Sequence, residues 1–169
     1  KSIDGLAIVP GPNLSYLTGS EFHLSERPVV LFVRQKDAIF VLPELESPKI
    51  ADLDIGFISY DDRDGPGPAF AQFSKNHKFS GLGVESRLIR HLELNLISSY
   101  NISSDIIDAT DLFAELRMSK SKLEIDHMTK AVETAERSLV SVLDKIRPGV
   151  TEKQFAAELV IQLLQNGSD

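Results

Sequence analysis

The stretch Val29-Val-Leu-Phe-Val-Arg-Gln-Lys-Asp-Ala-Ile-Phe-Val-Leu42 contains two apolar runs separated by the four polar residues 34–37. Runs this short and this rich in branched side chains favour strands that are buried on both faces over helices of the same length. A polar connection of this length fits a hairpin, which joins antiparallel neighbours. We therefore predict antiparallel strands over residues 29–33 and 38–42.

Further short apolar segments lie on both sides of this hairpin. They occupy residues 6–9, 55–60, 81–84 and 105–108, and two stretches that can be helical, 69–77 and 87–97, lie between the later ones. Strands that alternate with helices are typical of an α/β layer fold. Because the alternation includes an antiparallel hairpin, we predict an α/β fold with a mixed β-sheet.

The pattern changes after Ala109, where apolar residues begin to recur every three or four positions. Ser121 and Glu124 have the spacing of a capping box, and the apolar stripe that follows runs from Ile125 to Ile146. We predict a helix over residues 121–146. Pro148 interrupts the stripe after about three heptads, which is short for the alternative interpretation as a coiled coil.

A second amphipathic helix is predicted over residues 151–166. Thr151 and Gln154 form another capping box, and Gly167 fits a left-handed C-terminal cap. Two such helices can cover one another, but they would still present apolar surface. We place a domain boundary near residues 114–119.

Composition excludes several classes of partner. The net charge of −7 disfavours nonspecific binding to nucleic acid or to anionic membranes. The chain has no cysteine, which excludes disulfides and thiolate metal sites. Its apolar runs fall far short of the ~20 residues that span a bilayer. We expect a cytoplasmic protein with no nucleic-acid and no membrane partner.

No catalytic or metal-binding pattern is present in the sequence. The four histidines (His23, His77, His91 and His127) lack the spacing of metal ligands. Residues 61–65 resemble the middle of a calcium loop, but Tyr60 and Ala71 stand where that loop needs its first and last ligands. We interpret this acidic stretch as a solvated turn, and we predict no catalytic and no metal-ligating residue in this chain.

Several motifs together resemble the N-terminal part of the creatinase, prolidase and aminopeptidase P family. Asn13-Leu-Ser-Tyr-Leu-Thr-Gly19 is similar to the family's Asn-x-x-Tyr-Leu-Thr-Gly signature after the first strand. Other similarities follow in order along the whole chain: Gly83-Val-Glu85, Asp108-Ala109, Leu116-Arg-Met-Ser-Lys120 with Glu124-Ile125, and Ile146-Arg-Pro-Gly-Val-Thr-Glu152.

The resemblance implies two domains. Residues 1–116 would form the family's N-terminal domain, a mixed sheet with helices on both faces, and residues 117–169 would be the linker and first two helices of a pita-bread catalytic domain. In the family, the strands that carry the metal ligands follow such helices. The resemblance therefore implies that two divalent ions (manganese, cobalt or zinc) belong to the full-length parent, with none bound by this chain.

The implied function is that of the non-catalytic portion of an Xaa-Pro peptidase, of prolidase or aminopeptidase P type. Such a portion would pack against the catalytic domain of the same or a partner subunit, in a homodimer that cleaves short proline-containing peptides. Two alternatives are a creatinase-like amidinohydrolase and a non-catalytic protein-binding relative. Long acidic tracts would favour the latter, and only the cluster at residues 61–64 is present.

The loop of residues 20–27 holds the candidate substrate-binding residues. In relatives, the loop after the Tyr-Leu-Thr-Gly segment can reach the neighbouring subunit's active site. Phe22, His23 and Arg27 are therefore candidates for substrate contact, with histidine and arginine able to bind a substrate carboxylate. The alternative is structural: Phe22 would pack the loop on its own sheet, and His23 and Arg27 would be surface groups.

Overall fold

The computed structural model describes residues 2–168. The chain divides into two compact units, Lys1–Leu116 and Arg117–Asp169. The first unit contains a six-stranded sheet, and the second contains helices.

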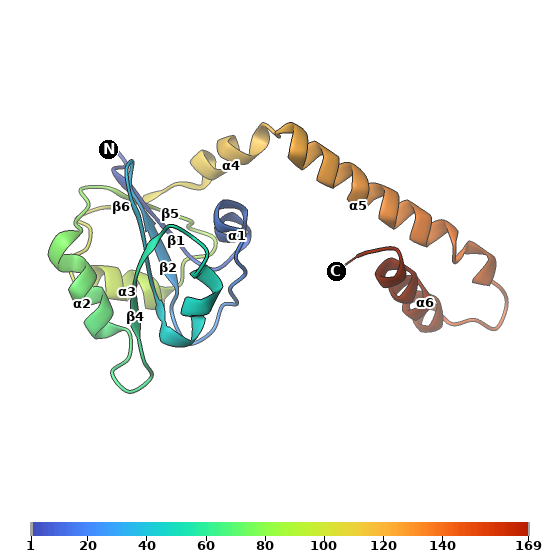
Figure 1. Ribbon diagram of the computed structural model, residues 1–169, viewed down its shortest axis with the longest axis horizontal. Coiled ribbons are helices and arrows are strands. Elements are labelled where there is room, and N and C mark those ends of the chain that lie inside the picture. Colours follow the sequence, from blue (N-terminus) through green and yellow to red (C-terminus); the bar gives the residue numbers. More distant parts are fainter. Residues whose placement is uncertain (1, 169) are drawn as a thin grey trace. The chain divides into compact units, whose positions relative to one another are not determined.

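The sheet of the first unit has the strand order β4-β3-β2-β1-β5-β6 (Figure 1). Only β2 runs antiparallel to its neighbours, and the other three pairings are parallel. The backbone N–H of Arg34 donates to the Asp37 carbonyl at 2.8 Å and closes the β2–β3 hairpin. The mixed sheet and the hairpin are therefore confirmed. The strands are β1 (Gly5–Ile8), β2 (Val30–Val33), β3 (Ala38–Pro43), β4 (Gly56–Tyr60), β5 (Leu82–Val84) and β6 (Ile106–Asp108).

Helices cover both faces of this sheet. The helices α2 (Gly67–Asn76) and α3 (His91–Ser99) lie on one face and α1 (Pro12–Thr18) on the other (Figure 1). Alternate strand residues enter two separate cores, so that Phe32 packs with Phe70 and Phe73 of α2, while its neighbour Leu31 packs with Leu14 of α1. The central strands are thus buried on both faces, as their unbroken apolar runs predicted.

The structure contains three helical segments that were not predicted from the sequence, and one of them is α1. A 3-10 helix, η1 (Glu44–Ile50), follows β3 and leads to β4. The helix α4 (Thr110–Met118) follows β6, where a linker was expected. Its first turn is capped by the Asp108 carboxylate, which accepts the backbone N–H of Thr110 at 3.0 Å and its hydroxyl at 2.6 Å.

The second unit contains α5 (Lys122–Val140), the 3-10 turn η2 (Leu143–Lys145) and α6 (Glu152–Gln165). Both predicted capping boxes form. The predicted end of the first helix at residue 146 was wrong, because the α-helix stops at Val140. The Ser141 hydroxyl donates to the Ser138 carbonyl at 2.7 Å. The next residue, Val142, is fully buried, and the chain continues as a 3-10 turn.

Polar groups join α5 to α6. Ser138 is fully buried, and its hydroxyl lies 3.0 Å from the Asn166 amide and 3.2 Å from the Gln162 carbonyl. Lys145 pairs with Glu158. The apolar stripe of α5 is left exposed at Ile125, Met128, Val132 and Leu139. Among the helices of residues 2–168, none is long and apolar enough to cross a membrane.

Candidate functional site

Potential metal ligands do not gather in the described part of the chain. Within residues 2–168, no group of three or more His, Asp or Glu side chains is placed to hold an ion. One histidine, His77, stacks on the Phe73 ring with 4.7 Å between ring centroids, and burial lowers its pKa.

The acidic stretch at residues 61–65 forms a closed turn. The Asp61 carboxylate accepts the backbone N–H groups of Arg63 and Asp64 at 3.0 and 2.9 Å. Gly65 adopts a left-handed conformation with φ of 66°, which glycine reaches without steric cost. The stretch is therefore a turn, as interpreted from the sequence.

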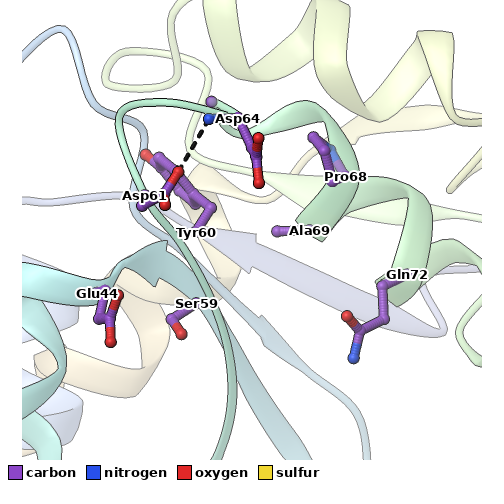
Figure 2. Close-up of a pocket in the computed structure, with 9 residues that line it drawn as sticks. Glu44, Ser59, Tyr60, Asp61, Asp64, Pro68, Ala69 and Gln72 are labelled. Atoms are coloured by element: carbon purple, nitrogen blue, oxygen red, sulfur yellow. Dashed lines mark hydrogen bonds between the residues drawn. The ribbon is translucent and has the colours of Figure 1, made fainter.

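This turn forms one wall of an open cavity of about 260 Å³ at the carboxyl end of β4 (Figure 2). Carboxylates of Glu44, Asp61 and Asp64 line it, together with Tyr60 and the first residues of α2. The sequence analysis missed this cavity because Glu44 comes from η1, and only the parallel pairing of β3 with β4 brings the two segments together. The acidic wall can attract cationic groups, and its lining includes no histidine to act as a base.

The predicted substrate-binding residues lie in the connection between α1 and β2. Phe22 is 7% exposed, and its ring centroid lies 5.7 Å from that of Phe40 in the core on the α1 side of the sheet. Lys49 lies over the same ring at 5.3 Å. The structure therefore places Phe22 as an anchor of the 20–27 loop.

Arg27 is held by an ion pair. Its Nε and Nη2 donate to the two carboxylate oxygens of Asp62 at 2.6 and 2.7 Å, and its Nη1 donates to Glu26 at 2.6 Å. The hydrogen bond from Arg27 lowers the pKa of Asp62, and the same bond raises the pKa of Arg27. At the next residue, the Pro28 carbonyl accepts the Tyr60 hydroxyl at 2.7 Å. Arg27 thus joins the loop to the turn after β4.

Sequence reasoning missed a second arginine that contacts the loop. Arg90 precedes α3, pairs with the fully buried Glu93, and donates from Nη1 to the Ser25 carbonyl. The backbone N–H of Arg90 also donates to the Glu93 carboxylate at 2.9 Å and caps the helix. The spacing of Arg90 and Glu93 is that of a capping box, but an arginine in place of serine or threonine conceals it.

His23 differs from the other two candidates because its side chain is exposed. Leu24 beside it is also exposed. The three predicted residues therefore lie in one loop but in different environments. Phe22 is buried, Arg27 is paired, and His23 and Leu24 form the accessible tip.

Local contacts explain three residues of the Asn-x-x-Tyr-Leu-Thr-Gly motif, namely Asn13, Thr18 and Gly19. Asn13 donates to the Glu85 carboxylate at 2.7 Å and links α1 to the end of β5. Glu85 is 4% exposed, and burial raises its pKa. Thr18 bonds back to the Leu14 carbonyl at 2.8 Å, and Gly19 ends the helix in a left-handed conformation with φ of 70°. These motif residues fix the start of the 20–27 loop.

Known proteins match the chain over nearly its whole length. The Xaa-Pro dipeptidase of Pyrococcus horikoshii is 24% identical over 175 residues, which cover 99% of this chain and 45% of that protein. The probable dipeptidase PepE of Mycobacterium bovis is 29% identical over 169 residues, covering 96% and 44%. This chain therefore spans about half the length of the curated relatives it matches.

Solved structures share the fold. The crystal structure of dipeptidase PepE from Mycobacterium ulcerans superposes with a TM-score of 0.79 at 27% identity, over 98% of this chain and 45% of that one. The family model for the creatinase/prolidase N-terminal domain matches residues 1–119. With the mixed sheet and the local role of the Asn13 motif, this match shows that the chain belongs to the creatinase/prolidase N-terminal domain family.

Proposed function

We propose that this chain is the N-terminal, non-catalytic portion of an Xaa-Pro peptidase that hydrolyses the bond preceding proline. The observation that supports this most directly is the extent of the match. Proteins named Xaa-Pro dipeptidase and dipeptidase align with 96–99% of the chain, and so with both of its units, using under half of their own length.

Two divalent ions, manganese, cobalt or zinc, are proposed for the full-length parent. Such a pair polarises a scissile carbonyl and supplies a hydroxide nucleophile. The described residues do not fit a metal pair, because no three potential ligands among residues 2–168 are placed to hold an ion. In this proposal the ligands belong to the remainder of the parent, and this chain shapes the substrate pocket.

The second unit is proposed to be the beginning of the catalytic domain. Large apolar side chains are exposed on both of its helices, such as Met128 and Val132 on α5 and Val160 and Leu164 on α6. Exposed apolar surface of this kind is typical of a docking face. We propose that it packs against the remainder of the catalytic domain, of the same or a partner subunit, in a cytoplasmic homodimer.

The 20–27 loop is proposed to contact the substrate of a neighbouring subunit. His23 is the residue best placed to do so, because its side chain is exposed, while Phe22 and Arg27 support the loop from within. A protonated histidine can bind the carboxylate of a short substrate. In the full-length protein, His23→Ala should lower kcat/KM for a dipeptide more than for a longer proline peptide. The kcat/KM of Arg27→Ala is measured on the same two substrates. Equal kinetics on both substrates would remove the loop from the active site.

The reaction itself is tested by supplying the full-length protein with three substrates. We expect hydrolysis of an alanyl-proline dipeptide or of a longer peptide with proline in second position. Turnover of creatine alone would identify the alternative amidinohydrolase. Failure to hydrolyse any of the three in the presence of manganese, cobalt or zinc would favour the non-catalytic protein-binding alternative.

A further inference from the structure

Besides the buried Phe22, three polar contacts attach the 20–27 loop to its own domain. The Ser20 hydroxyl donates to the Lys49 carbonyl of η1 at 2.8 Å. Arg90 at the start of α3 donates to the Ser25 carbonyl, and Arg27 pairs with Asp62 in the turn after β4. Because each attachment reaches a different element, the loop has little freedom to rotate as a unit.

These attachments differ in strength. Both side chains of the Arg27–Asp62 pair are partly exposed, at 35% and 62%, so that water and salt weaken it. The Arg90 side chain is 32% exposed, but its partner Glu93 is fully buried and holds it through Nε at 3.0 Å and through a second ion-pair contact. A buried carboxylate that is paired in this way fixes the guanidinium, because separation would leave its charge unpaired.

We propose that Arg90 and Glu93 are positioning residues for the tip of the loop. The Glu93 carboxylate fixes Arg90, Arg90 holds the Ser25 carbonyl, and the tip residues His23 and Leu24 are thereby presented in one geometry before any substrate binds. This inference rests on the proposed contact between His23 and substrate. Preorganisation of this kind reduces the entropy that is lost on binding.

The conservative substitution Arg90→Lys tests the attachment. Lysine retains a positive charge for Glu93, but it lacks the planar guanidinium that donates to the Glu93 carboxylate and the Ser25 carbonyl at once. Arg87→Lys is the matched control, because Arg87 is an exposed arginine in the same connection. In this chain, Arg90→Lys should lower the ¹⁵N heteronuclear NOE of residues 21–26. It should also speed cleavage by Glu-C protease after Glu21 or Glu26 about tenfold, the change expected from the loss of one hydrogen bond to a charged group.

A second variant and a salt series separate the attachments. Glu93→Gln keeps a cap for α3 and removes the charge, so it should loosen the loop as Arg90→Lys does. High salt weakens the Arg27–Asp62 pair, yet the wild-type loop should stay ordered because the carboxylate of the Glu93–Arg90 pair is fully buried. An Arg90→Lys loop as rigid as wild type would overturn the proposal.

Kinetics of the full-length protein test whether the attachment acts through His23. Arg90→Lys should raise KM for an alanyl-proline dipeptide and lower kcat/KM about tenfold. In a His23→Ala background the same substitution should have no further effect, which a general loss of stability would not reproduce. Additive effects would overturn the positioning role. If His23→Ala leaves kinetics unchanged while the Arg90→Lys loop loosens, the proposed substrate contact fails and the attachment is purely structural.

Discussion

Replacing Phe22 by alanine should lower the free energy of unfolding of this chain by about 3 kcal/mol. Fully buried Phe→Ala substitutions cost roughly 3–5 kcal/mol, and the low end applies here because a loop can partly close over the space. The ring is only 7% exposed and packs on Phe40, and Lys49 over its face adds a further contact. In a domain of this size, the loss lowers the Tm by about 10 °C.

The matched control is Phe57→Ala. Phe57 lies on the edge strand β4 and is 51% exposed, so its removal should cost under about 1 kcal/mol. Urea denaturation followed by circular dichroism measures both variants beside wild type. If Phe22→Ala were as stable as Phe57→Ala, Phe22 would not anchor the loop, and the reasoning from its burial would fail.

Three further predictions concern other parts of the chain. Hydrogen bonds, first from Ser86 and then from Thr110, lower the pKa of Asp108 from 3.8 to about 2. Its contribution to stability is therefore complete above the higher value and lost as pH falls through the lower one. Asp108→Asn should thus destabilise the chain at neutral pH, and urea titrations should show this effect vanishing as pH falls through about 2. Ser138→Ala should lower the free energy of unfolding by about 1–2 kcal/mol, because it leaves the Asn166 amide without this partner. An unchanged free energy of unfolding in calorimetry would refute the stabilising role of the Ser138–Asn166 hydrogen bond. Val132→Glu should reduce self-association of the chain, measured by light scattering, because the exposed stripe of α5 loses apolar surface. Unchanged scattering would show that the stripe does not drive self-association.

The sheet could be predicted from the sequence because its strands are buried on both faces. Unbroken apolar runs such as residues 29–33 favour strands that are buried on both faces. The four-residue hairpin connection then determined that two of these strands are antiparallel. The capping boxes at Ser121 and Thr151 likewise placed two helix starts, since their partners are only three residues away.

Besides α1, three helical features were not predicted from the sequence. The helix expected to reach residue 146 ends at Val140, and two residues later Val142 is fully buried. Short η1 has no amphipathic period, and α4 is capped by Asp108 from two residues upstream. These signals are local but too weak to identify alone.

The candidate site also combines features that the local sequence predicts with features that it does not. The sequence predicted a polar loop at residues 20–27 and left open whether Phe22, His23 and Arg27 contact substrate or serve structure. Arg27 is paired because the turn after β4 brings Asp62 beside it, 35 residues away, and Arg90 lies 65 residues from its acceptor Ser25. Pairings across such separations follow from strand order, which the sequence did not specify.

The most direct test of the proposed function compares this chain with the full-length parent in hydrolysis of an alanyl-proline dipeptide, at equal molar concentration and with manganese added. We predict turnover by the parent and none by the chain above the buffer rate, because no described group of residues can hold the ions. Turnover by the purified chain alone, lost on chelation of the metal, would contradict the assignment of this chain as the non-catalytic portion.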